Sequence, residues 1–121
     1  SRIGACGGRV LSCDPQTPVE KYIDQKNYFS QADYADGQAS FLPWIMTCNA
    51  IFRKSMFERI GYFDNRLRNV DDTDFSWRIC LGGFQIKYVE KAVVYHKRRS
   101  TLKSIFSQFF NYGYGQVMLE R

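Results

Sequence analysis

Short apolar runs and segments of helical periodicity alternate along this 121-residue chain. Residues 3–13 form a glycine-interrupted apolar run that predicts a strand. The runs 41–52, 84–88 and 92–96 predict further strands. Because strand and helix patterns interleave instead of falling into separate blocks, the sequence predicts an α/β fold.

Three helices are predicted between and after these strands. Their start and end markers are Ser55 and Gly61, Asp71 and Gly82–Gly83, and Ser100 and Gly113–Gly115. Apolar residues of the last helix recur with the spacing of a single helix face, so we expect Phe106, Phe109 and Phe110 to pack into a core. Anchoring an apolar acceptor or a membrane surface is the alternative.

The segment 14–40 is polar and begins with two prolines. It predicts a long excursion over the surface, with a short helix near residues 19–27. Ordered loops of this length are often functional.

The composition predicts one soluble globular domain over residues 1–121, since 45% of the residues are hydrophobic and 17% aromatic. No run approaches the roughly 18 to 20 apolar residues of a membrane span, and the first residues lack the layout of a signal peptide. The four cysteines are scattered, and one histidine cannot complete a zinc site with them. They are interpreted as reduced thiols of a cytoplasmic protein, with a disulfide as the alternative.

The net charge of +5 is concentrated at three consecutive residues, Lys97, Arg98 and Arg99. Such a cluster can bind phosphates, nucleic acid or anionic lipid headgroups, or it can be an ordinary solvated loop. The other basic residues are dispersed among acids and form no stripe, which argues against nucleic-acid binding.

Asp71, Asp72 and Asp74 stand together at the start of the second predicted helix. Carboxylates at a helix N-terminus accept N–H bonds and complement the helix dipole, so helix capping is one interpretation. Three carboxylates exceed what one cap needs, and clustered carboxylates repel one another. A functional role for the surplus is the other interpretation.

His96 is the only histidine, and it directly precedes the basic run. A lone histidine can be purely structural. Beside carboxylates, imidazole suits Mn²⁺ or Mg²⁺, and the neighbouring cations suit a pyrophosphate.

Residues 49–83, NAIFRKSMFERIGYFDNRLRNVDDTDFSWRICLGG, carry three ordered motifs: N-x-x-x-R-[RK], I-G-x-F-D and [ED]-D-x-D-[LF]-x-x-R. Residues 84–98 end in V-x-H, and residues 100–115 form an aromatic segment with two glycines. Together with residues 3–10, these segments resemble inverting family-2 glycosyltransferases of the GT-A fold. The resemblance covers most of residues 3–115 except the loop around 14–40.

The resemblance implies a role for each matching residue. Asp72 would be the general base that deprotonates the acceptor hydroxyl. Asp71 would stand beside it in the catalytic pair, where many members have Glu. Asp74 and Arg78 would lie on the substrate-binding side and hold the helix and loop together.

On the donor side, the resemblance implies that His96 helps to ligate a divalent metal, Mn²⁺ or Mg²⁺. Lys97, Arg98 and Arg99 would lie near the diphosphate of a nucleotide-sugar. The acceptor would be a glycan, a lipid-linked molecule or a protein, and the chemistry would take place in the cytoplasm, at or near the inner face of the plasma membrane.

The resemblance also implies an N-terminal βαβ half that binds the nucleotide and carries an Asp-x-Asp motif. The sequence has no such motif apart from Asp72-Thr73-Asp74, which already belongs to the downstream pattern. We therefore expect a partial GT-A fold, three-layered with a mixed sheet, that lacks this half and is inactive alone. A non-catalytic module that binds a glycan or an anionic headgroup is the alternative.

Overall fold

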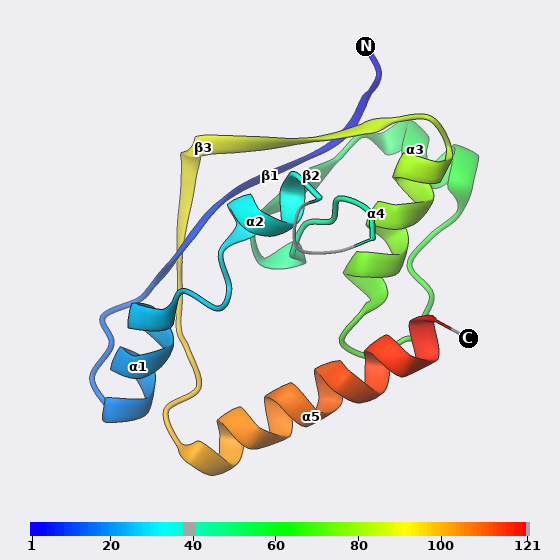
Figure 1. The fold of residues 1–121 in the computed structure, drawn as a ribbon. Helices are drawn as coiled ribbons and strands as arrows, with labels where there is room; N and C mark the ends of the chain where they lie inside the picture. The colour runs from blue at the N-terminus through cyan, green and yellow to red at the C-terminus, as the bar shows by residue number, and fades with distance from the viewer. Residues whose placement is uncertain (38–40, 121) are drawn as a thin grey trace.

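A computed structural model of the chain describes residues 1–37 and 41–120, and it has a three-stranded sheet with helices around it (Figure 1). The elements are β1 (Ile3–Ser12), α1 (Pro18–Lys26), α2 (Gln31–Ala35), a 3₁₀ turn η1 (Thr47–Asn49), β2 (Ala50–Phe52), α3 (Lys54–Ile60), α4 (Asp71–Leu81), β3 (Gln85–His96) and α5 (Leu102–Leu119). The predicted α/β class is confirmed. Residues 38–40 of the predicted loop lie outside the described residues.

The sheet is mixed, in the order β2-β1-β3. The central strand β1 is antiparallel to β2 and parallel to β3. Figure 1 shows β3 as a long strand with a sharp bend, where two separate strands were predicted. The bend accompanies a shift of register: Gly8 pairs with Val89, whereas Arg9 pairs with Val93.

Asn49, from the first sequence motif, bridges β1 and β3 at this register shift. Its side-chain amide donates to the backbone carbonyls of Arg9 and Ala92, each at 2.9 Å. A Cβ on Gly8 would lie 2.1 Å from the Ala92 carbonyl oxygen and 2.5 Å from the Asn49 amide nitrogen. The glycine therefore allows the close approach of three chain segments at the bulge.

The prediction of a strand over residues 41–52 is wrong except for Ala50–Phe52. Backbone groups of the preceding residues bond to residues of helices α2 and α4 instead of a neighbouring strand. The Ile45 N–H donates to Ser76 Oγ at 3.2 Å, and the Leu42 carbonyl accepts from the Trp77 indole at 3.1 Å. Because helices α2 and α4 satisfy these groups, the segment 41–46 needs no strand partner.

Two predicted helix starts are shifted by one or two residues. The N-cap of α3 is Arg53, not Ser55. The N-cap of α5 is Thr101, not Ser100, because Thr101 Oγ1 accepts the Ser104 N–H at 3.1 Å and Ser104 Oγ returns a bond to the cap. This reciprocal pair is a capping box, which fixes where the helix begins.

The prediction that Gly113 and Gly115 end the last helix is also wrong, since α5 continues to Leu119. Gly115 is buried, and a Cβ there would lie 2.8 Å from the Arg68 carbonyl and 2.9 Å from a Val70 methyl. No atom lies within 4 Å of the corresponding position on Gly113. Gly115 thus allows α5 to cross closely over the turn that leads into α4.

The core is built on α4 and the sheet. Phe75 and Ile79 are fully buried there with Met56 and Ile45, and Phe75 stacks on Phe57 at 4.9 Å between ring centroids. The expectation that the phenylalanines of α5 pack into a core is wrong. Phe106 and Phe110 are 72% and 64% exposed, and Phe109 is 41% exposed beside Phe29.

No helix within residues 1–37 and 41–120 combines the length and the apolar character that crossing a membrane requires. All four cysteines are free thiols, as predicted.

Candidate active site

A cleft of about 550 Å³ opens at the N-terminal end of α4. Residues from five separate parts of the chain line it. Among them are Asp71, Asp72, His96 and Arg98, so the structure brings four of the predicted site residues to one place. The acidic turn and the end of β3 are about 25 residues apart in the sequence, and the strand β3 returns its last residue to the start of α4.

The Asp72 carboxylate is held by two backbone N–H groups. Oδ1 accepts from Thr73 at 2.9 Å, and Oδ2 accepts from Thr47 at 3.4 Å. Burial raises the pKa of Asp72 to about 6; the two N–H donors oppose this rise, and the neighbouring charge of Asp71 adds to it. A carboxyl group with this pKa is ionised at neutral pH and is basic enough to take a proton from a hydroxyl in a transition state.

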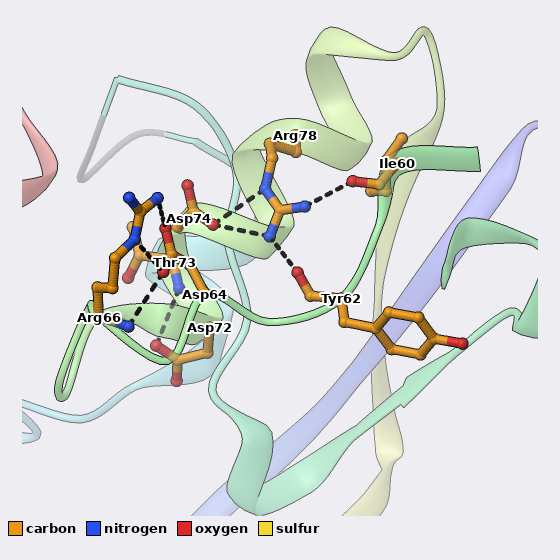
Figure 2. Close-up of polar contacts among 8 residues, drawn as sticks. All are labelled: Ile60, Tyr62, Asp64, Arg66, Asp72, Thr73, Asp74 and Arg78. Carbon is orange, nitrogen blue, oxygen red and sulfur yellow. Dashed lines mark hydrogen bonds and ion pairs between the residues drawn. The ribbon is translucent and has the colours of Figure 1, made fainter. Parts of the chain in front are cut away.

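The N-cap of α4 is Val70, which has no capping side chain. The acidic trio is therefore not a simple cap: Asp72 faces the cleft, whereas Asp74 turns to a different side of the helix and pairs with Arg78 (Figure 2). Of the three carboxylates, Asp71 and Asp72 line the cleft, and only Asp74 has separate surroundings.

Asp74 and Arg78 join α4 to the loop after α3. Arg78 Nη2 lies 2.8 Å from Asp74 Oδ2, and the guanidinium also donates to the carbonyls of Ile60 and Tyr62 at 2.7 and 2.8 Å (Figure 2). The guanidinium carbon also lies 5.1 Å from the centroid of the Phe75 ring. Neither residue is among those that line the cleft. These contacts agree with the expectation that the pair holds helix and loop together, and substrate binding by it stays a prediction.

The basic residues after His96 differ in their contacts. Lys97 Nζ lies 3.1 Å from Glu20 Oε1, and the Glu20 side chain is only 2% exposed. The Thr17 and Gln16 N–H groups, with help from Lys97, lower the pKa of Glu20 to about 2. Lys97 thus has a partner that fixes the N-terminus of α1 beside the end of β3.

Arg98 occupies the wall of the main cleft. Its guanidinium lies 5.0 Å from the centroid of the Phe29 ring, and its Nε donates to Ser12 Oγ at 3.3 Å. Among residues 1–37 and 41–120, no acidic side chain forms an ion pair with Arg98 or Arg99. With His96, the three basic residues also line a smaller adjoining hollow of about 270 Å³.

His96 has the electrostatic character of a metal ligand but lacks companions. Burial and the charges of Arg98 and Arg99 lower the pKa of His96, which favours the neutral imidazole that a metal ion binds. No group of three His, Cys, Asp or Glu side chains in the described parts of the chain is close enough to hold an ion. The described part of the chain therefore does not form a complete metal site. His96 would need further ligands from another part of the whole protein.

Aromatic side chains of the cleft were missed as site residues in the sequence. Tyr28, Phe29 and Tyr34 come from the predicted surface excursion, and Trp44 comes from the segment predicted as a strand. The available signal was the density of aromatic residues in a segment that is otherwise polar. That signal does not say which way the rings point.

An α/β domain with a mixed sheet and this cleft is consistent with part of a GT-A-like glycosyltransferase domain. The family model described as "Glycosyl transferase family group 2" matches residues 22–120. The chain therefore belongs to this family of glycosyltransferases.

Two curated relatives are similar to the chain. The pre-mycofactocin glycosyltransferase of Mycobacterium tuberculosis is 25% identical over 111 residues, which cover 87% of this chain and 23% of the relative. The succinoglycan biosynthesis protein ExoA of Rhizobium meliloti is 26% identical over 69 residues, or 57% of this chain and 21% of the relative. The chain thus spans about a quarter of the length of the relatives that it matches.

Proposed function

We propose that the protein to which this chain belongs transfers a sugar from a nucleotide-sugar to an acceptor hydroxyl, with inversion, and that Asp72 is the general base. The observation that carries the proposal is the Asp72 carboxylate in the cleft, with a pKa raised to about 6 and two N–H donors that fix its orientation. Membership of the family supports the reaction class.

In the proposed reaction, Asp72 takes the proton of the acceptor hydroxyl while the hydroxyl oxygen attacks the anomeric carbon of the donor sugar. The new C–O bond forms as the bond to the diphosphate oxygen breaks on the opposite face, which inverts the configuration. The nucleoside diphosphate leaves with the bonding electron pair. Asp71, which lines the same cleft, adds negative charge that keeps Asp72 basic.

We propose that Arg98, within the basic run, binds the leaving diphosphate. It lines the cleft with Asp72, and its guanidinium is oriented by Phe29 and Ser12. Arg99 lines the adjoining hollow and would add charge there. Lys97 is a weaker candidate because Glu20 already neutralises it.

A divalent metal, Mn²⁺ or Mg²⁺, remains a proposal for the whole protein, with His96 as one ligand. Such an ion would supply charge neutralisation for the diphosphate. The described residues offer no complete ligand set, so none of the steps assigned to this chain depends on the ion. We further propose that the acceptor is presented on the cytoplasmic side of the plasma membrane.

The test uses the whole protein with UDP-, GDP- and dTDP-sugars, and measures release of the nucleoside diphosphate with and without a panel of saccharide acceptors. We expect Asp72→Asn to lower kcat by about 10²- to 10⁴-fold, the usual contribution of a general base. Circular dichroism checks that the variant folds. Wild-type turnover by a folded Asp72→Asn protein would eliminate the base role.

If the folded wild-type protein binds a saccharide but transfers no sugar from any donor, the enzyme proposal is wrong. The non-catalytic binding module then takes its place.

A further inference from the structure

The aromatic side chains of the cleft form two groups. Tyr34 and Trp44 pack against each other at 4.6 Å between ring centroids. The second group is centred on Phe29, which stacks on Phe109 at 6.0 Å and meets Tyr112 edge-on at 6.3 Å. Arg98 covers Phe29 from another side, so this second group is largely occupied with its own contacts.

Two hydrogen bonds and the neighbouring core residues hold the Tyr34–Trp44 pair in place. The Trp44 N–H donates to the Tyr34 carbonyl at 3.1 Å, and the Tyr34 hydroxyl donates to the Tyr28 carbonyl at 2.9 Å. The next residues in the chain, Ala35 and Ile45, are buried in the core, being 4% and 0% exposed. The core residues therefore anchor both segments, while the two rings remain half-buried and line the cleft.

The pair also has a short connection to the proposed base. Trp44 lies three residues before Thr47, whose N–H donates to Asp72. Three residues of chain reach at most ~10 Å. A ligand that rests on Trp44 can therefore place a neighbouring group at the Asp72 carboxylate.

The polar side chains that line the cleft indicate which kind of ligand fits there. Asp71 and Asp72 disfavour an anionic headgroup at this end of the cleft, and the amide side chains of Asn69, Gln108 and Gln116 offer both donors and acceptors. A pyranose ring has an apolar C–H face that packs on an aromatic ring and hydroxyls that bond to carboxylates and amides. A purely apolar ligand would remove water from these carboxylates and amides without offering them a hydrogen bond.

We propose that the Tyr34–Trp44 pair is the platform on which a sugar ring of the acceptor stacks, so that the acceptor presents a saccharide hydroxyl to Asp72. The inference rests on the proposed function and deepens it by naming the acceptor class. Within the cleft, the acceptor is a sugar residue and not a peptide side chain or a lipid headgroup.

Intrinsic fluorescence tests the binding directly, because the chain has only two tryptophans. Trp77 donates its indole N–H to the Leu42 carbonyl and packs edge-on against Phe41, and it does not line the cleft. Within these 121 residues the Trp77→Phe variant leaves Trp44 as the only tryptophan, and Trp44→Phe is the matched control. The probes are neutral gluco-, galacto- and manno-oligosaccharides, with the open-chain alditols sorbitol and mannitol for comparison.

We expect at least one oligosaccharide to change the Trp44 emission of Trp77→Phe saturably, with no change for Trp44→Phe or with the alditols. The inference is overturned if no oligosaccharide changes the emission. It is equally overturned if only vesicles of anionic phospholipid or a serine-rich peptide do so.

Kinetics of the whole protein separate this inference from the proposed function. Losing one aromatic stacking contact should raise the acceptor KM of Trp44→Ala about tenfold, while Trp44→Phe keeps most of the affinity. An unaltered acceptor KM in a folded Trp44→Ala protein would contradict the platform inference, whatever the activity of Asp72→Asn. If Trp44→Ala raises KM but Asp72→Asn transfers normally, the platform stands and the base assignment fails.

Discussion

The backbone N–H of Thr47 lies 3.4 Å from the carboxylate of Asp72, across 25 positions of sequence. This contact joins the start of η1 to the first turn of α4. The segment 41–46, directly before η1, carries Trp44, and the turn carries Asp71. One tertiary contact therefore sets the distance between the proposed base and the wall against which an acceptor would rest.

The raised pKa of Asp72 predicts a stability effect of definite sign. The folded pKa of about 6 exceeds the unfolded value of about 3.8, so the folded state binds the proton more tightly. The contribution of Asp72 to stability should therefore fall as the pH rises from about 4 to 6 and then level off. Asp72→Asn removes this cost, and we expect it to be more stable at pH 8 by about 2 kcal/mol after allowance for partial exposure. Urea unfolding at pH 8 and pH 4 measures the difference, which should nearly vanish at pH 4; equal stability of the two proteins at pH 8 would contradict it.

The same group should control the acid limb of activity. Because the base must be ionised, kcat/KM of the whole protein should fall about tenfold per pH unit below about pH 6. Asp71→Asn removes a charge that raises the Asp72 pKa. In this variant we therefore expect kcat/KM to begin to fall at a lower pH than in the wild type. A pH–rate profile checks both statements. An acid limb that stays at the same pH in Asp71→Asn would show that another group titrates there.

Arg98 and Lys97 are adjacent, but their contacts predict different effects. Arg98→Met should raise the KM for the nucleotide-sugar about tenfold by removing a charged donor from the cleft wall. Lys97→Met should leave that KM within about twofold, since Lys97 is paired with Glu20. It should instead speed hydrogen exchange of the α1 amides, Pro18–Lys26, which the pair helps to dock. Equal effects of the two substitutions on KM would refute this division of roles.

Gly113 and Gly115 form a matched pair within α5. Gly113→Ala should stabilise the chain by about 0.5–1 kcal/mol, because the site is open and alanine favours helix. Gly115→Ala should destabilise it by about 1–3 kcal/mol, because its Cβ would lie 2.8 Å from the Arg68 carbonyl. Thermal unfolding of both variants is the measurement. A stabilising Gly115→Ala would mean that α5 does not cross the Arg68–Val70 turn closely.

Much of the fold could be predicted from the sequence where the signals are local. Helix α4 begins at Asp71 as expected, because acidic residues followed by helical spacing are a start signal within one turn. The alternating apolar residues of β3 were also visible, although the bulge near Ala92 made one strand look like two. Asp72, His96 and Arg98 were singled out from the acidic cluster, the only histidine, the basic run and the family motifs, and the structure places all three in one cleft.

What the sequence by itself determined was the α/β class, the family motifs and the residue types available for chemistry, because these depend on spacing along the chain. The tertiary structure alone decided the rest. The segment 41–46 is not a strand because helices α2 and α4 supply its hydrogen-bond partners. Helix α5 does not stop at Gly115, where Arg68 and Val70 pack against it. The pKa of Asp72 depends on burial by residues distant in sequence. Hydrogen-bond partners, close packing and desolvation are properties of the folded neighbourhood, and no local pattern specifies them.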